Sequence, residues 1–99
     1  MTLTATNLGN GPFEGFMPEV LTTLFRLDPC EDVEYVVVSN LPEDDTFDAE
    51  TCVFAAHEDG SLNVQYYMSF GTILDLPGDV PAADALALLG YELDTVDAQ

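Results

Sequence analysis

The chain has 99 residues, of which 47% are hydrophobic, so it is long enough and apolar enough to form one globular domain spanning 1–99. Nineteen acidic residues stand against one arginine, Arg26, and no lysine, which gives a net charge of −18. This charge excludes direct binding to nucleic acids and to anionic membranes, because both need a basic surface. It also destabilises the compact state through self-repulsion, so we expect a basic partner, bound cations or high salt to offset it.

The first quarter of the chain predicts a short strand followed by a helix. Residues 2–8 place threonine at alternate positions, which favours an edge strand, and the Gly-Asn-Gly-Pro sequence at 9–12 ends it. Residues 18–27 are predicted to be helical because Pro18 and Glu19 suit a first helical turn. Apolar side chains also recur there at helical spacing, namely Met17, Val20, Leu21, Leu24 and Leu27.

Residues 33–41, VEYVVVSNL, are rich in β-branched and aromatic side chains, and they predict a central strand buried on both faces. A polar loop at 42–50, PEDDTFDAE, follows this strand. The loop holds the densest acidic run of the chain, Glu43, Asp44, Asp45, Asp48 and Glu50.

A β-hairpin over residues 51–70 is the predicted centre of the fold. Asp59-Gly60 lies between two alternating apolar segments, and both residues accept the positive φ of a type I′ turn. A two-residue turn would gather one set of side chains on a core face, namely Val53, Ala55, Leu62, Val64, Tyr66 and Met68. The opposite face, which we expect to be half covered or to bind a partner, carries Cys52, Phe54, Asn63, Gln65 and Tyr67.

The C-terminal part predicts one more helix. Residues 71–76 either extend the second hairpin strand or bend away from it, and 77–79 form a turn. The helix at 81–89 is stopped by Gly90, and its buried stripe contains Leu86, Leu89 and either Ala82 or Ala85. Residues 91–96 are either a short return strand or a tail. The sequence thus predicts an α+β fold, with a small antiparallel sheet of three to four strands around the hairpin, packed with two helices.

No catalytic constellation is visible in the sequence. Cys52 and the only histidine, His57, lie five positions apart in one predicted strand, so their side chains point to opposite faces about 16 Å apart. A pairing of Cys30 with His57 stays geometrically open, and nineteen acidic residues make any carboxylate pair uninformative. We therefore expect no enzymatic activity. Cys30 and Cys52 are expected to be free, buried thiols, with a disulfide between them as the alternative.

The acidic run at 43–50 offers the oxygen ligands that Ca²⁺ prefers. Its spacing does not fit the EF-hand loop, which needs a glycine at its sharp turn. Zinc would need three or four Cys, His or carboxylate ligands, and the chain supplies few of the first two. We interpret the run as solvated, and we expect no metal and no cofactor.

The acidic residues instead predict a partner-binding surface. Eighteen charges correspond to roughly 30 Å of duplex DNA, close to the diameter of about 30–35 Å expected for a chain of this length. The carboxylates that would present this phosphate-like field are Glu31, Asp32, Glu34, Glu43, Asp44, Asp45, Asp48, Glu50, Glu58 and Asp59. Because apolar hot spots supply most of the affinity of an interface, an anchor is also expected, from Tyr67 and Phe54 or from Phe47.

In size, charge and lack of basic residues the chain resembles the small acidic DNA-mimic inhibitors of phages and mobile elements, among them anti-restriction proteins, uracil-DNA glycosylase inhibitors and several anti-CRISPR proteins. The resemblance implies a non-enzymatic inhibitor that blocks the basic DNA- or RNA-binding channel of a defence protein such as a CRISPR effector complex. The implied partner is thus a basic nucleic-acid-binding protein or complex.

Two other interpretations of the charge stay open. The chain could be a small acidic adaptor or chaperone that binds a basic partner protein, or a salt-adapted domain whose acidity serves solvation. The N-terminal segment lacks the basic and apolar regions of a signal peptide, and no apolar run approaches the roughly 20 residues of a membrane-spanning helix. We expect a cytoplasmic protein, in the host cell if it is phage-encoded, and either a monomer or a homodimer.

Overall fold

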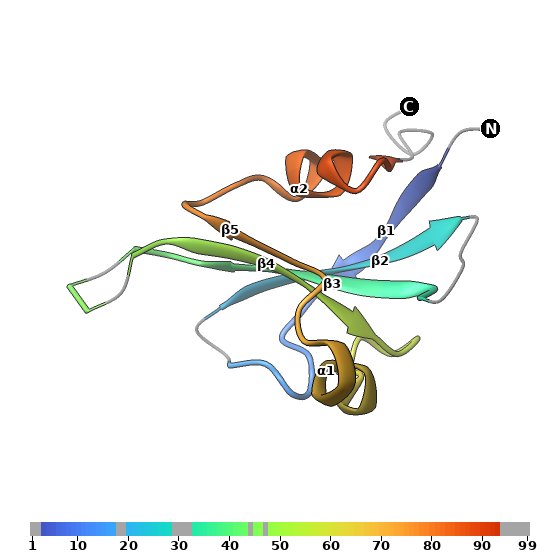
Figure 1. Ribbon diagram of the computed structural model, residues 1–99, viewed down its shortest axis with the longest axis horizontal. Coiled ribbons are helices and arrows are strands. Elements are labelled where there is room, and N and C mark those ends of the chain that lie inside the picture. The colour runs from blue at the N-terminus through green and yellow to red at the C-terminus, as the bar shows by residue number, and fades with distance from the viewer. Residues whose placement is uncertain (1–2, 18–19, 29–32, 44, 47, 94–99) are drawn as a thin grey trace.

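Six strands pair side by side into one mixed sheet in the part of the chain that the computed structural model describes, residues 3–17, 20–28, 33–43, 45–46 and 48–93. The elements are, in chain order, β1 (Thr4–Asn10), β2 (Leu21–Asp28), β3 (Tyr35–Leu41), β4 (Glu50–Ala56), α1 (Val64–Phe70), β5 (Leu74–Pro77), α2 (Ala82–Leu88) and β6 (Glu92–Leu93). The strand order is β5-β4-β3-β2-β1-β6, and neighbours are antiparallel except for the parallel pair β1 and β6. In Figure 1 the sheet is strongly twisted, with α2 over one face and α1 on the opposite side.

An apolar cluster lies on each face of the sheet. Under α2, the buried members are Ala5, Phe25, Leu27, Val36, Val38, Val53, Ala85 and Leu86. On the other face, Leu24, Val37 and Ala56 are buried beneath the partly buried rings of Phe13, Phe16 and Tyr35. Successive valines of β3 therefore point into different clusters, as the period-2 geometry of a strand requires. The predicted burial of this strand on both faces is confirmed.

The predicted fold class is wrong. The sheet has six strands and mixed pairing, where three to four antiparallel strands around a hairpin were expected. The two helices are only seven residues long and lie on opposite sides of the sheet. The additional strands come from segments whose sequence favoured a helix or left the conformation open, and the two corrections that follow give the physical reasons.

Residues 21–28 form β2, not the C-terminal part of a helix, and residues 18–19 of the predicted helix lie outside the described residues. Both faces of β2 are covered, so Phe25 and Leu27 point toward α2 while Leu24 points to the opposite face. When both faces of a strand are apolar, some apolar residues are three or four positions apart in the sequence, which is also the spacing of the apolar face of a helix. Because β1 and β3 pair with β2 along both of its edges, the strand is favoured over the helix.

The predicted hairpin is half right. Asp59-Gly60 does lie in a tight turn, since the His57 N–H donates to the Ser61 carbonyl over 2.9 Å and Ala56 bridges to Leu62. It is not the predicted two-residue type I′ turn, because Gly60 has a positive φ but Asp59 does not, and because His57 lies opposite Ser61. The chain then leaves the sheet and forms α1 where a second strand was expected, because the Asn63 side chain caps the helix by accepting from the Tyr66 N–H over 3.1 Å. β5 takes the edge of β4 instead. Of the predicted core face, Val53 and Ala55 are buried, whereas the helical Val64 and Met68 are exposed.

The remaining predicted elements fare better. The helix predicted at 81–89 is α2, with Ala85 and Leu86 buried and Ala82 and Leu89 packed against the same core. The strand predicted at 2–8 is β1, and it is an edge strand only beyond Ala5, because the two-residue β6 pairs with its outer side at Thr4 and Ala5. β6 also shows that the segment from 91 begins as a short strand, and residues 94–96 lie outside the described residues.

Candidate partner-binding surface

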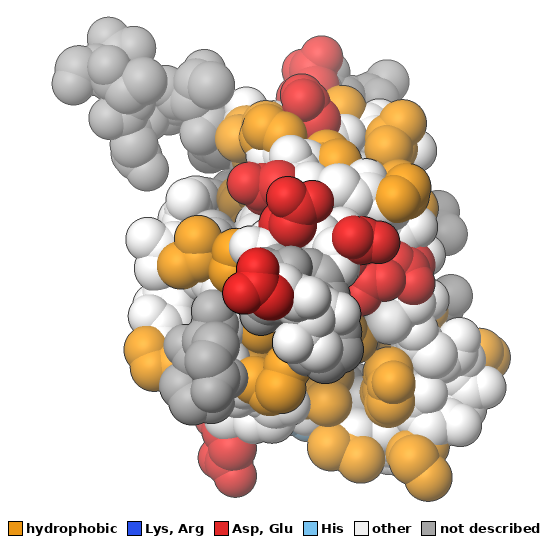
Figure 2. Space-filling view, turned by 90° about the vertical axis from the view of Figure 1, so that its left-hand side faces the viewer, with side chains coloured by type: hydrophobic (Ala, Val, Ile, Leu, Met, Phe, Trp, Pro, Cys, Tyr) orange, Lys and Arg blue, Asp and Glu red, His pale blue; other side chains and the backbone are white. Residues whose placement is uncertain are grey.

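One end of the sheet is rich in carboxylates. Glu43, Asp45 and Asp48 are exposed in the β3–β4 loop, and Glu50 opens β4 beside them. On the neighbouring strand, Asp75 pairs opposite Cys52, and Asp79 lies two residues beyond the end of β5. We call this group the acidic end; its members are Glu43, Asp45, Asp48, Glu50, Asp75 and Asp79. Figure 2 looks onto it and shows Asp and Glu side chains gathered across its middle, with hydrophobic side chains below them.

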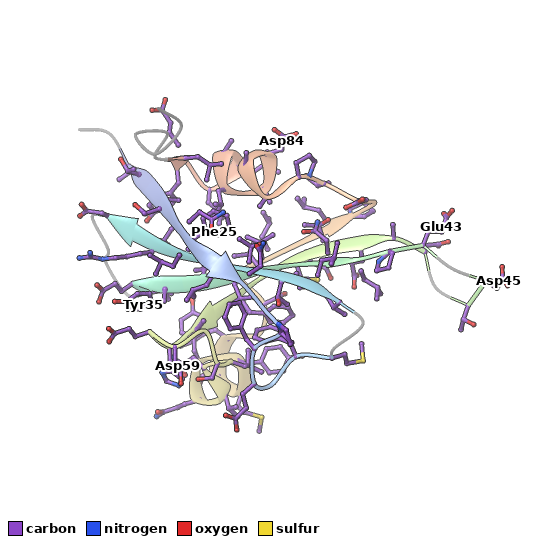
Figure 3. All side chains as sticks on the ribbon, turned by 180° about the vertical axis from the view of Figure 1, so that it is seen from behind. Phe25, Tyr35, Glu43, Asp45, Asp59 and Asp84 are labelled. Carbon is purple, nitrogen blue, oxygen red and sulfur yellow. The ribbon has the colours of Figure 1, made fainter. Side chains whose placement is uncertain are left out.

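The predicted set of partner-binding carboxylates does not form one patch. Glu34, Glu58 and Asp59 lie at the opposite end of the sheet, near the start of β3 and beyond the end of β4. Figure 3 shows this separation, with Glu43 and Asp45 at one end and Asp59 toward the other. The seven residues of β3 separate the two ends by about 20 Å at the rise of an extended strand. Glu31, Asp32, Asp44 and Phe47 were also predicted to bind the partner, and they lie outside the described residues.

Two of the carboxylates at the opposite end already have partners. The only arginine, Arg26, donates from Nε to Glu34 Oε2 over 3.2 Å. Asp59 accepts from both the N–H and the hydroxyl of Ser61, at 2.9 and 2.6 Å, and these hydrogen bonds lower the pKa of Asp59. The role of Asp59 is therefore to hold the turn that precedes α1.

An open groove lies beside the acidic end, on the face of the sheet opposite α2. Its volume is about 310 Å³, and its lining includes Phe16, Leu41, Phe54, Leu62 and Tyr67. The ring centroid of Phe54 lies 5.3 Å from that of Phe16 and 5.9 Å from that of Tyr67, distances typical of favourable aromatic pairs. We call this feature the aromatic groove. Phe54 and Tyr67, expected on a mixed face that could bind a partner, do lie together, but as walls of a groove.

Close packing around the turn positions the walls of the groove. The Leu62 N–H donates to the Glu14 carbonyl over 3.0 Å, which ties the 13–17 segment to the start of α1. Gly60 has a φ of +89°, and a Cβ there would lie 2.3 Å from the ring of Phe13. Only glycine can both adopt this positive φ and leave room for the ring of Phe13. The predicted turn residue thus also packs against an aromatic side chain, a contact that the sequence did not predict.

Glu50, Cys52 and Asp75 form a cluster where the groove meets the acidic end. The Cys52 thiol lies 3.6 Å from Asp75 Oδ1, and one ligand atom from each of the three residues lies within 4.8 Å of the others. The hydrogen bond and the charge of Asp75 raise the pKa of Glu50. Burial, followed by the charges of Glu50 and Asp75, raises the pKa of Cys52 to about 12. Cys52 is thus a neutral thiol at pH 7, which makes it a poor nucleophile.

This cluster is also the place where the described residues offer a donor set for a metal. Two carboxylates and a thiol could hold a divalent cation, but Cys52 would first have to lose a proton that its surroundings retain. Of the acidic run at 43–50, in which cation ligands were considered, Glu50 is the one described carboxylate that belongs to the group. His57 is exposed next to the turn and contributes to no such group among the described residues.

The sequence did not reveal the contribution of Asp75 and Asp79 to the acidic end, nor that of Phe16 to the groove. The alternation of Leu74, Asp75 and Leu76 is a signal that Asp75 faces away from the core, but it does not identify β4 as the partner strand. β5 pairs with β4 because the connecting segment that contains α1 returns the chain to the outer edge of β4.

No protein-family model, no curated protein and no solved structure matches the chain. Neither helix in the described part of the chain has the length and apolar character needed to cross a lipid bilayer.

Proposed function

We propose that this protein is a non-enzymatic inhibitor that mimics the charge of a nucleic acid and blocks the DNA- or RNA-binding channel of a defence protein, for example a CRISPR effector complex. The observation that carries the proposal is the uncompensated charge of the acidic end. The single arginine is paired with Glu34 at the other end of the sheet, and the chain contains no lysine. The carboxylates of the acidic end therefore have no Lys or Arg of their own chain to neutralise them.

The shape of the molecule is compatible with this role. Its principal extents are 42 × 32 × 21 Å, and Figure 3 shows Glu43 and Asp45 at one end of the molecule and Asp59 toward the other. Eighteen negative charges at the spacing of duplex DNA occupy roughly 30 Å. The net charge of −18 would attract a positively charged channel, which steers association and speeds it at low salt, and the acidic end is the part proposed to enter the channel.

The chemistry of the groove favours binding over catalysis. The thiol that lines it is protonated at neutral pH, and His57, the only histidine, lies beyond the opposite end of β4. Cys52 and His57 are therefore not placed to act together as nucleophile and general base. Inhibition by occupation of a channel needs neither.

A second candidate follows from the placement of the charges. Exposed carboxylates lie at both ends of the sheet and on α2, where Asp84 is exposed. This spread favours a salt-adapted domain, whose stability would depend on screening of its own repulsion. Such a domain should be mostly unfolded near 0.05 M salt and folded near 2 M, and circular dichroism across that range would detect the transition.

A competition experiment tests the mimic. The tagged protein is used to capture proteins from bacterial lysate at low ionic strength, bound proteins are eluted with duplex DNA, and the eluate is identified by mass spectrometry. We expect nucleic-acid-binding proteins that the DNA displaces. The variant Glu43→Lys, Asp45→Lys, Asp48→Lys should lose them at least tenfold.

The matched control reverses three exposed carboxylates at the other end, Asp28→Lys, Glu58→Lys and Glu92→Lys, with the same change of net charge. This control should retain most of the binding. Equal losses in both variants would show that general charge, and not the acidic end, is responsible. Captured proteins that DNA fails to displace would point to an adaptor for a basic protein instead.

A further inference from the structure

Exposed apolar side chains lie on α1, the helix that supplies the groove wall Tyr67. α1 contributes no buried residue, and Val64, Met68 and Phe70 are 56%, 79% and 74% exposed. Met17, 60% exposed, adds another apolar side chain at the mouth of the groove. An apolar groove with exposed apolar side chains and a charged border is typical of a binding interface.

The charge of the chain selects the kind of partner. Two copies would each bring a charge of −18 to a shared interface, so self-association opposes a large repulsion. A basic partner gains attraction from the same charges. The groove opens beside Glu50, and Glu50 lies next to Asp75 with no basic side chain of this chain among the lining residues. A groove with apolar walls and an anionic rim is thus complementary to a ligand that has an apolar group next to a cation.

We propose that the aromatic groove binds a short segment of a basic protein in which a phenylalanine, or an apolar side chain of similar size, sits next to an arginine whose guanidinium pairs with Glu50 and Asp75. This inference rests on the proposed function and names the anchor that holds the charged partner in place. The apolar side chain lies between Phe54, Tyr67 and Leu41, and the guanidinium lies at the rim.

The dimensions and the rim chemistry fit this occupant. A volume of about 310 Å³ is near the lower limit for small-molecule pockets, so it suits a single bulky side chain better than a cofactor. At the rim, the hydrogen bond with Asp75 and the charge of Asp75 raise the pKa of Glu50, so the pair favours a shared proton. A guanidinium can replace that proton by donating to both carboxylates from its rigid planar fork, for which arginine is better pre-organised than lysine.

Three capped peptides serve as probes: Arg-Arg-Phe-Arg-Arg, Arg-Arg-Ala-Arg-Arg and Ser-Ser-Phe-Ser-Ser. Titration calorimetry near 0.05 M salt should show that the first binds the full chain at least tenfold more tightly than either of the others. In NMR spectra of the wild-type protein, the first peptide should shift the signals of Leu41 and Phe54, a readout that depends on no substitution.

Two pairs of variants locate the binding. Tyr67→Ser removes one wall of the groove and should reduce the affinity for the Phe peptide to within about twofold of that for the Ala peptide. Phe70→Ser changes an aromatic residue of the same helix that is not among the lining residues of the groove, and should leave the preference intact. Glu50→Gln should weaken the Phe peptide several-fold, whereas Asp48→Asn, which removes the same charge from the loop, should not.

The failures are distinguishable. Equal affinity for the Phe and Ala peptides would overturn the groove as an anchor site and leave binding of basic proteins at the acidic end standing. Equal affinity for the Phe peptide and the uncharged peptide would overturn both the rim contact and the charge-based function. Absence of measurable binding by all three peptides would overturn the groove proposal, while the lysate competition would still decide the proposed function.

Discussion

The Cys52 thiol hydrogen-bonds to Asp75 Oδ1 over 3.6 Å, and it thereby links the neighbouring strands β4 and β5 at the rim of the aromatic groove. The contact joins a buried neutral donor to an exposed anion, with Glu50 close to both. The stability and the reactivity of this corner of the sheet therefore depend on which of the three groups carries a proton.

The first prediction concerns the pH dependence of stability. Asp75 raises the pKa of Glu50, so the pair stabilises the fold below the ordinary pKa of a glutamate and loses that contribution as the pH rises through the raised value. Asp75→Asn removes the repulsion. We expect this variant to have a higher free energy of unfolding than the wild type at pH 7, and the gain to shrink toward pH 4. Urea unfolding at both pH values measures the difference.

Asp48→Asn is the control for that experiment, because it removes one charge from an exposed position in the loop. If the two variants show the same change at both pH values, relief of the overall charge accounts for the effect, and the specific pairing of Glu50 with Asp75 contributes nothing.

The second prediction is that Cys52 is chemically inert in the folded protein. With a pKa of about 12 the thiolate fraction at pH 8 is very small, although the higher intrinsic nucleophilicity of such a thiolate offsets part of the loss. In a Cys30→Ser background, alkylation by iodoacetamide should be slower by on the order of a hundredfold in the folded chain than in urea. Similar rates in both states would contradict the protected, protonated thiol.

The third prediction compares two buried threonines. Thr51 Oγ1 accepts from the Val80 N–H over 2.8 Å and donates to the Gly78 carbonyl over 3.0 Å, so it secures the chain between β5 and α2. Thr51→Val leaves the buried N–H without this acceptor. We expect a loss of about 1–3 kcal/mol of unfolding free energy, measured by urea denaturation.

Thr22 provides the matched control for Thr51. Within the described part of the chain, its hydroxyl oxygen is buried without a hydrogen-bond partner. Thr22→Val should therefore be neutral or stabilising, although the chemical change is the same and both side chains are buried. If both variants lose the same free energy, the hydrogen bonds of Thr51 are not what the substitution removes.

The fourth prediction is that α1 can be destabilised without destabilising the core. Asn63→Ala removes the N-cap and should destabilise the helix by about 1 kcal/mol, whereas Asn63→Asp keeps a capping oxygen. Because α1 contributes no buried residue, we expect faster hydrogen exchange at the Tyr67 and Gly71 amides with little change in the global unfolding midpoint. A large fall in the midpoint would show that the helix is part of the cooperative core.

Local sequence signals predicted the elements that depend on local chemistry. The apolar run of β3, the turn at Asp59-Gly60 and the helix before Gly90 all carry their own signals, and each is present. The failures concern choices made at long range. The sequence of β2 predicts a helix because both faces of the strand are apolar. Residues 64–70 were predicted as a strand because nothing in their pattern indicates that β5, and not this segment, pairs with the outer edge of β4.

The candidate site was predictable only in part. The loop carboxylates Glu43, Asp45 and Asp48 were recognised from their density in the sequence, and they do lie together. Glu34 and Asp59 were grouped with them, although strand direction places them at the other end of the sheet. The groove requires Phe16, Phe54 and Tyr67 to meet from three separate segments, and no spacing within one segment encodes such a meeting.

The strands at the two margins of the sheet are short, since β6 has two residues and β5 has four, the last of them a proline without an N–H. β5 thus offers few free main-chain donors and acceptors to another strand. β6, however, covers β1 only at Thr4 and Ala5, so the outer edge of β1 beyond Ala5 pairs with no other strand in the described part of the chain. The two margins therefore differ: strand addition is disfavoured along β5, whereas β1 presents main-chain groups in a row that the irregularity between Asn7 and Gly9 interrupts.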